Sequence, residues 1–158
     1  MAAYGTDSPE WKALPWEWAA ARLISNKNYW VVTVSADSAP HALPVWGVWS
    51  DEDLRFMFSC APTARRVRNI AVNPRVVFTV DSTVECVSVE GVAAPIIDPD
   101  RVDVWIDRYV AKYGSEVPEG LGDFVRSHAM IEVEPTIAFA IIEREDEFAL
   151  RATRWRFA

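Results

Sequence analysis

Two neighbouring segments of the chain, residues 29–36 and 41–50, have the composition of strands and carry apolar side chains on both faces. Valine and aromatic residues favour extended backbone, and a polar turn at residues 37–40 separates the two segments. Strands of this kind are buried on both sides, as in a barrel or between a sheet and a partner chain. The two segments therefore favour a sheet that is closed or covered.

Five further segments have strand patterns, at residues 54–59, 75–81, 84–95, 128–143 and 147–157. Within them, Gly91 predicts a bend and Pro135 a break. A barrel of six or seven strands accounts for these elements, because closure removes the exposed edges that such apolar strands would otherwise present.

Helical patterns predict the peripheral elements of a mainly β (α+β) fold. The predicted helices span residues 8–25, with Pro15 starting a second helix, a segment between Thr63 and the Asn73-Pro74 stop, and residues 98–113. Residues 115–123 are predicted to form a surface connection or a lid. We expect one domain over residues 1–158, with residues 1–27 as an N-terminal helical segment.

The composition limits the partners of the chain. Its 158 residues are 51% hydrophobic, include eight tryptophans and carry a net charge of −7. The apolar excess suggests an oligomer, the charge argues against binding to nucleic acid or anionic lipid, and no segment is apolar for long enough to span a membrane. Cys60 and Cys86 have no metal-site or redox spacing, and residues 1–6 lack the pattern of a signal peptide, so we expect a cytoplasmic protein.

Arg65, Arg66 and Arg68 lie together on a short predicted helix of this acidic chain. Thr63 is predicted to cap the helix, which places Arg65 and Arg66 in its first turn. Cations there oppose the helix dipole unless an anion such as phosphate neutralises both. The alternative is that these arginines pair with surface carboxylates, which we expect for Arg68.

Pro44 interrupts the strand pattern of residues 41–50. Because proline cannot donate to a strand neighbour, it marks an edge or a bulge. A planar ring lying against Pro44, Val45 and Trp46 would find backbone donors and apolar surface together, although a bulge at a barrel corner gives the same pattern.

No phosphate-binding glycine loop, zinc-protease motif or serine elbow is present, and we predict no catalytic side chain and no metal site. His41 and His128 are interpreted as surface or packing residues, with proton donation as the alternative. A cofactor with its own reactivity needs only a ring platform and a phosphate clamp from the protein.

Three blocks of sequence together resemble one family. Residues 40–49 (PHALPVWGVW), 65–76 (RRVRNIAVNPRV) and 152–157 (ATRWRF) are similar to the flavin and deazaflavin oxidoreductases of the pyridoxamine phosphate oxidase-like superfamily. The resemblance runs from about Trp16 to the C-terminus. It is strongest to the branch that uses coenzyme F420 in actinobacteria.

This resemblance implies a split β-barrel of antiparallel strands that forms a homodimer with cofactor sites at the interface. It implies that Arg65 and Arg66 hold the cofactor phosphate, that Ser59, Thr63 and Asn69 support them, and that Pro44, Val45 and Trp46 lie along the ring. Arg154 and Arg156 are implied to reach the cofactor or the partner chain.

The implied activity is hydride transfer between reduced F420 and an unsaturated small molecule such as an enone, a quinone or a tetrapyrrole-like compound. Relatives that share this barrel bind FMN, F420 or haem. An FMN-binding oxidoreductase and a noncatalytic binder of cofactor or haem are therefore the alternatives.

Overall fold

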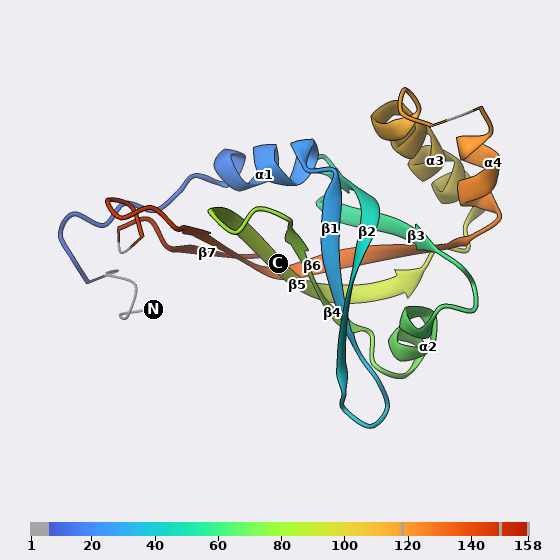
Figure 1. Cartoon of the computed structure of the whole chain (residues 1–158), viewed down its shortest axis with the longest axis horizontal. Helices are drawn as coiled ribbons and strands as arrows, with labels where there is room; N and C mark the ends of the chain where they lie inside the picture. Colours follow the sequence, from blue (N-terminus) through green and yellow to red (C-terminus); the bar gives the residue numbers. More distant parts are fainter. Residues whose placement is uncertain (1–6, 118, 149, 158) are drawn as a thin grey trace.

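Seven strands and four helices make up the part of the chain that the computed structural model describes, residues 7–117, 119–148 and 150–157 (Figure 1). The strands are β1 (Asn28–Val34), β2 (Pro40–Ser50), β3 (Arg55–Cys60), β4 (Arg75–Val80), β5 (Glu85–Pro95), β6 (Ala129–Ile142) and β7 (Thr153–Arg156). The helices are α1 (Trp16–Ser25), α2 (Arg65–Val72), α3 (Pro99–Tyr113) and α4 (Leu121–Arg126).

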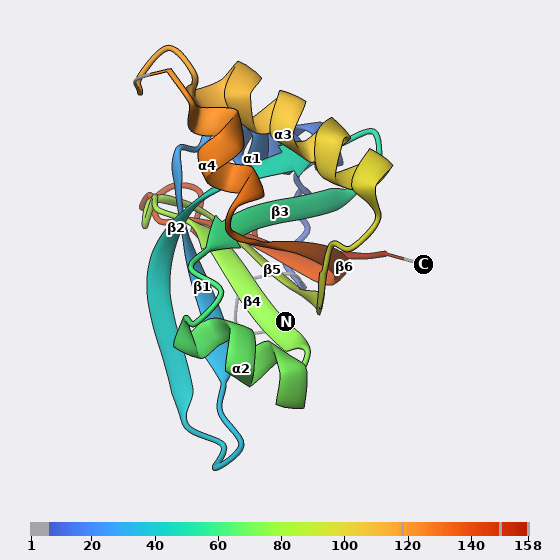
Figure 2. The same ribbon diagram turned by 90° about the vertical axis from the view of Figure 1, so that its right-hand side faces the viewer.

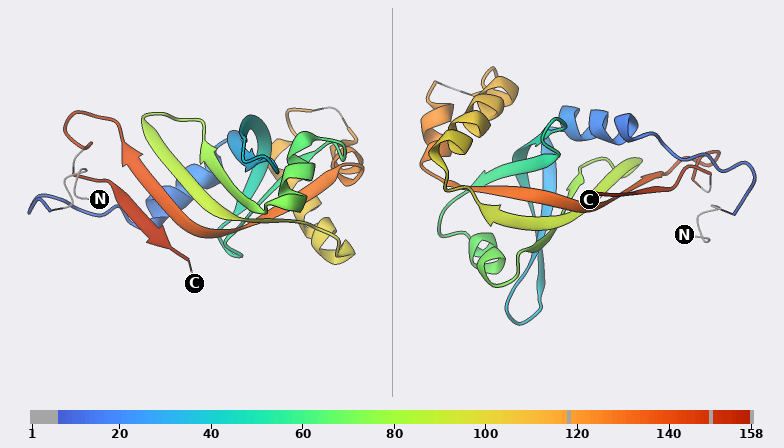
Figure 3. Two further views of the ribbon diagram at one scale, coloured as in Figure 1. Left: turned by 90° about the horizontal axis from the view of Figure 1, so that it is seen from below. Right: turned by 180° about the vertical axis from the view of Figure 1, so that it is seen from behind.

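The sheet closes on itself. The strands follow the order β3-β2-β1-β4-β5-β6-β7, every pair is antiparallel, and β3 also pairs with β6. Six strands thus form a barrel. Strand β7 extends the sheet by pairing with residues 137–140 of β6 (Figure 3). The mainly β fold with a barrel of six to seven antiparallel strands, predicted from the sequence, is confirmed.

The barrel interior is filled by alternate side chains of the strands, which is the expected arrangement for a closed sheet. Phe56 and Phe78 stack at its centre, with ring centroids 4.2 Å apart. Leu23 of α1 and Ile70 of α2 join this core from opposite sides of the barrel (Figure 1). The two short helices therefore cover the interior where the strands diverge.

Helices α3 and α4 form a layer outside the barrel, over β2 and β3 (Figure 2). Trp105 and Tyr109 of α3 bury their rings against Met57 of β3 in a second apolar cluster. This layer covers the outer face of β2 near Trp46 and Val48, which explains why that strand is apolar on both faces. The apolar stripe predicted on the helix at 98–113 is confirmed as packing.

Charged groups fix α3 to the barrel. Asp53 accepts hydrogen bonds from Arg101 and Arg108, and Glu132 of β6 accepts one from Nε1 of Trp105 at 2.5 Å. The hydrogen bond from Arg108 lowers the pKa of the Asp53 carboxyl. The arginines of α3 are therefore occupied by carboxylates of the barrel.

The N-terminal helix is shorter than predicted. Helix α1 begins after Pro15, as expected for the second helix, but residues 8–14 are not helical. The backbone N–H groups of Lys12 and Leu14 donate instead to the oxygens of Leu150 and Thr153, so this segment lies along the C-terminal part of the chain. Residues 1–6 of the predicted segment 1–27 lie outside the described residues.

Three predictions for the second half of the chain are corrected. Strand β6 continues through Pro135, because the register with β5 shifts beside it. Glu90 pairs with Ile137 and Gly91 with Pro135, so Thr136 is the extra residue. Only residues 153–156 of the predicted strand at 147–157 pair with β6. Helix α4 begins within the loop predicted at 115–123.

Strand β1 is buried on one face in the single chain, not on both as predicted. Tyr29, Val31 and Thr33 point into the barrel, whereas Trp30 is 45% exposed. Among the described elements, no helix covers the outer face of β1 (Figures 1 and 2).

We predict that Gly91→Ala destabilises the fold by about 1–3 kcal/mol through overpacking. A Cβ at Gly91 would lie 2.4 Å from the backbone oxygen of Glu134, which the sheet holds in place. Gly122→Ala is the control, because its Cβ would lie 3.3 Å from a side-chain methyl of Ile106 and alanine favours the helix. Urea unfolding of both variants measures the difference, and equal stabilities would contradict the prediction.

Candidate functional site

A small cavity of about 220 Å³ lies between the β1–β2 hairpin and the start of α2. It is lined by Val31, Thr33, His41, Ala42, Leu43, Arg65 and Arg66. Thr33 lies directly opposite His41 in the strand pairing, and Val31 lies opposite Leu43. Opposite residues of an antiparallel pair share one face, so these four side chains form one wall of the cavity.

Helix α2 brings the two arginines to this wall. The amide of Asn69, which is 4% exposed, donates to Oγ1 of Thr33 at 2.9 Å. Ile70 enters the barrel core beside it. The predicted supporting residue Asn69 thus holds α2 against β1, and its side chain is already used in that contact.

Arg65 and Arg66 have no hydrogen bond or ion pair with any of the described residues. The arginines of α3, in contrast, are saturated by Asp53 and Glu132. Two neighbouring cations at the start of a helix repel each other and the positive end of the dipole. The pKa of the exposed Asp37 carboxyl is lowered by its hydrogen bond with Ser35 and also by the charge of Arg65, but Asp37 does not line the cavity. Among the described residues, two positive charges and no negative one therefore line the cavity.

The predicted cap of this helix is not formed. Residues 61–64 form a turn in which the N–H of Ala64 donates to the oxygen of Ala61, so Ala64 occupies the cap position, with no side-chain hydrogen bond. The side chain of Thr63 is exposed, and its carbonyl accepts from Nη1 of Arg68 at 2.7 Å. Arg68 thus pairs with a backbone oxygen, where a carboxylate was expected.

Ser59 lies on the other side of β3 from the barrel interior. Its neighbours in the strand, Phe58 and Cys60, pack toward the core, whereas Ser59 hydrogen bonds to the hydroxyl of Tyr109 in α3. Burial raises the pKa of that tyrosine to about 12. The structure does not bring Ser59 into the cavity that Arg65 and Arg66 line.

The predicted ring platform does not present three side chains to one surface. Val45 points into the barrel, Trp46 points outward and stacks on Tyr113 with centroids 4.7 Å apart, and Pro44 is exposed. Residues 40–46 have one strand edge without a neighbouring strand. They pair with β1, whereas pairing of β2 with β3 starts only at Gly47, so some of their backbone groups have no strand partner.

Two residues that sequence reasoning missed end this free edge. The hydroxyl of Tyr113 contacts both the N–H and the oxygen of Gly47, at 3.0 and 2.7 Å. Nζ of Lys112 donates to the same oxygen at 3.0 Å and to the hydroxyl of Tyr29 at 2.8 Å. The only signal in the sequence was a lysine beside the apolar stripe of α3, which does not reveal these partners.

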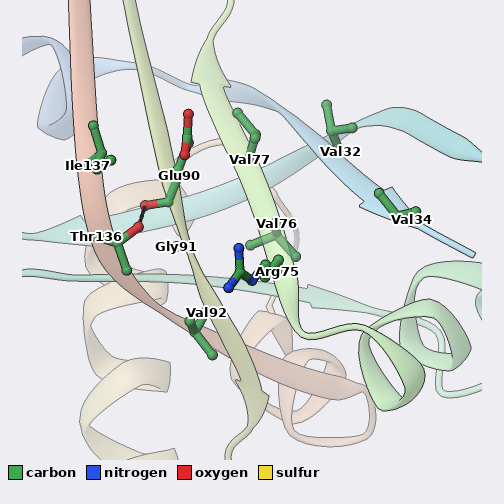
Figure 4. Close-up of a pocket in the computed structure, with 10 residues that line it drawn as sticks. All are labelled: Val32, Val34, Arg75, Val76, Val77, Glu90, Gly91, Val92, Thr136 and Ile137. Atoms are coloured by element: carbon green, nitrogen blue, oxygen red, sulfur yellow. Dashed lines mark hydrogen bonds between the residues drawn. The ribbon is translucent and has the colours of Figure 1, made fainter. Parts of the chain in front are cut away.

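A second hollow of about 460 Å³ lies on the outer face of the sheet (Figure 4). It is lined by Val32, Val34, Arg75, Val76, Val77, Glu90, Gly91, Val92, Thr136 and Ile137. We call it the valine groove. The side chain of Arg75 lies within it and makes no hydrogen bond or ion pair to the residues that the structure describes. The groove is the uncovered outer surface of β1, β4, β5 and β6.

The remaining candidates lie outside both hollows. His128 packs on the ring of Phe124, and its Nδ1 contacts the oxygen of that residue at 2.7 Å. Arg154 and Arg156 are exposed on one face of β7. His128 therefore has the packing role that the sequence indicated.

The sequence model of the family described as "Pyridoxamine 5'-phosphate oxidase" matches residues 8–141. Among curated proteins, none matches the chain by sequence. Among the helices of the described residues, none has the length and apolar character needed to cross a membrane.

Several solved structures share the fold. One is described as an F420 reductase; it is 22% identical, has a TM-score of 0.58, and the match covers 79% of this chain and 98% of that chain. HutZ, the haem storage protein of Vibrio cholerae, is 19% identical with a TM-score of 0.62, over 78% and 91% of the two chains. The conserved protein Rv2991 of Mycobacterium tuberculosis is 16% identical with a TM-score of 0.65, over 90% and 85%. The TM-scores show that these proteins share the fold of this chain.

We predict that Lys112 makes stability rise with pH between about 8 and 9.5. Burial lowers the pKa of this amine to about 8, whereas a lysine in an unfolded chain has a pKa of about 10.4. In this range the unfolded chain binds more protons, so raising the pH favours the folded state. Urea unfolding should show this rise in the wild type and not in Lys112→Met.

Lys12→Met is the control, because Lys12 is exposed. Its stability should follow the wild-type pH dependence. A parallel dependence in the wild type and Lys112→Met would contradict the prediction.

Proposed function

The chain belongs to the pyridoxamine 5'-phosphate oxidase family, and we propose that it is an oxidoreductase that uses the deazaflavin coenzyme F420 to reduce an unsaturated small molecule. The observation that carries this proposal is the cavity in which Arg65 and Arg66 meet with no carboxylate partner among the described residues. Arg101 and Arg108 pair with Asp53, whereas Arg65 and Arg66 line a hollow and make no ion pair with the described residues.

The cavity suits the phosphate of a cofactor. Arg65 and Arg66 would hold the phosphate by charge-assisted hydrogen bonds, which relieve the repulsion between the two cations. Asn69 would fix their position through its hydrogen bond to Thr33. Thr63 and Ser59 do not line the cavity. Their proposed role is support of the turn before α2 and of β3.

The free edge of β2 suits the ring. Leu43 lines the cavity and directly precedes Pro44, so a molecule held at Arg65 can extend along residues 44–46. Backbone groups without a strand partner would bind the polar edge of the ring, and the stack of Trp46 on Tyr113 keeps this segment rigid. Bound F420 would supply the hydride, and the protein would position two planar molecules and exclude water.

FMN is the alternative cofactor, because Arg65 and Arg66 suit its phosphate equally well. A noncatalytic binder of cofactor or haem is the remaining candidate, and the shared fold with HutZ supports testing it. The thiols of Cys60 and Cys86 are free, and we retain the proposal of a cytoplasmic protein.

We also propose that the protein is a homodimer whose second subunit covers the valine groove. Trp30 and Val92 are 45% and 42% exposed on this face, and both belong to strands of the barrel. Arg75 and Glu90 lie in the same groove, so two copies related by a twofold axis can pair opposite charges. The partner would complete the wall of the cofactor site.

Titration of the purified protein with F420, FMN and haem tests the proposed function, followed by oxidation of reduced F420 with quinone, enone and biliverdin-like acceptors. We expect F420 to bind at micromolar concentration and to be oxidised only with an acceptor present. Arg65→Ala and Arg66→Ala should each weaken binding about 10- to 100-fold, the effect of losing a charge-assisted hydrogen bond.

Arg126→Ala is the matched control, because it removes the same charge from α4, where Arg126 pairs with Asp103. Copurification of FMN without F420 binding would select the alternative cofactor. Unchanged affinity in both arginine variants would exclude the proposed clamp.

Val92→Asp should convert the proposed dimer to a monomer and weaken cofactor binding, because a buried charge would face the partner. Sedimentation velocity at micromolar concentration measures the oligomeric state. Ile97→Asp is the control, since Ile97 is 88% exposed and lies outside the groove. A wild-type monomer under these conditions would refute the dimer.

A further inference from the structure

His41 has an unsatisfied polar atom at the candidate anion site. Its Nε2 is buried and has no hydrogen-bond partner among the described residues. A buried polar atom without a partner is destabilising, because it has lost its hydrogen bonds to water. Such atoms are rare in folded chains, and a bound water, ion or ligand is one of the explanations for them.

The position of this atom is defined by the strand pairing. His41 lies opposite Thr33 and lines the same cavity as Arg65 and Arg66. Oγ1 of Thr33 already accepts from Asn69, so the cavity wall places the imidazole beside a hydroxyl that is engaged. The imidazole of His41 and the guanidinium groups of Arg65 and Arg66 therefore line one cavity. Nε2 of His41 and both guanidinium groups lack a hydrogen-bond partner among the residues described.

Two other buried atoms without a partner differ from this one. Nε of Arg22 and Nε of Arg151 also lack a hydrogen bond. However, Arg22 is paired with Glu85 and Arg151 with Glu147 through other nitrogens, and neither lines the cavity. Within the part of the chain that the structure describes, only the imidazole combines an unpaired buried atom with a place in this cavity.

We propose that Nε2 of His41 is the third ligand of the anion, donating a hydrogen bond to an oxygen of the phosphate that Arg65 and Arg66 hold. The inference rests on the phosphate clamp of the proposed function. A phosphate presents its oxygens in several directions, so donors from β2 and from α2 can bind it from two sides. The contribution of His41 to affinity would therefore depend on the phosphate group of the ligand and not on its ring.

Affinities of His41→Leu and His41→Gln test this role. The glutamine amide nitrogen retains a donor near the position of Nε2, whereas leucine keeps bulk without a donor. We expect His41→Leu to bind F420 and FMN about 10- to 100-fold more weakly, and His41→Gln to recover most of this loss. Binding of riboflavin and of a phosphate-free deazaflavin should change less than twofold in either variant.

Stability separates binding from folding. Without cofactor, His41→Leu should melt at a temperature no lower than the wild type, because the substitution removes an unsatisfied polar atom. An equal loss of affinity for phosphate-free ligands, or a lower melting temperature that accounts for the loss, would overturn the inference.

Imidazole ¹H–¹⁵N spectra give a direct readout. The chain has two histidines, so His128→Gln assigns the signals and serves as the matched control. The Nε2 signal of His41 should shift on addition of inorganic phosphate or FMN, and not with riboflavin.

Unchanged cofactor affinity in His41→Leu, together with a loss in Arg66→Ala, would refute the inference and leave the proposed function intact. Absence of F420 and FMN binding to the wild type would refute the proposed function. In that case the response of His41 to inorganic phosphate still decides whether the residue is an anion ligand.

Discussion

The organisation of this molecule depends on how strand β2 divides its pairing at Gly47. From Pro40 to Trp46 the strand pairs with β1, and from Gly47 to Ser50 it pairs with β3. A side chain at Gly47 would collide with the ring of Phe56, 2.4 Å from its Cβ, so glycine permits the close approach that closes the barrel. Tyr113 then binds both backbone groups of Gly47. At Gly47 the strand therefore exchanges one neighbour for the other, and residues 40–46 keep an edge without a strand partner on the side away from β1.

Arg65 and Arg66 form a small basic patch on a chain that is acidic overall. The chain carries a net charge of −7, which repels polyanions at long range. Most of its arginines are occupied by carboxylates, as Arg101 and Arg108 are by Asp53. Arg65 and Arg66 escape this pairing because α2 stands on the barrel with the hairpin beside it and no acidic side chain lines their cavity. The cavity is therefore lined by two cations that make no ion pair with the described residues.

Local patterns predicted the strands well, because alternation of apolar residues is set by the two faces of a sheet. The inward faces of Val76 and Phe78 followed from this rule and are confirmed. At Gly91, where the glycine predicted a bend, the register with β6 shifts. The place of Pro135 within β6 could not be predicted in the same way, since it depends on the pairing with β5, whose register shifts beside Pro135. For the candidate site, Arg65 and Arg66 could be identified from the sequence, because neighbouring arginines stand out in an acidic chain. The contacts of Lys112 and Tyr113 had none, because their partners are fixed only when α3 packs on the barrel.

Strand β1 links the two hollows of the molecule. Val31 and Thr33 line the anion cavity from its inner face, while Val32 and Val34 line the valine groove from its outer face. A sheet is one backbone thick, so anything that docks in the groove also restrains the residues that form the cavity wall. Thr33 connects β1 to α2, because its hydroxyl accepts a hydrogen bond from Asn69. Helix α2 carries both arginines. A second subunit seated in the groove would thus stabilise the phosphate clamp through β1, which gives a physical reason for coupling between dimer formation and cofactor binding.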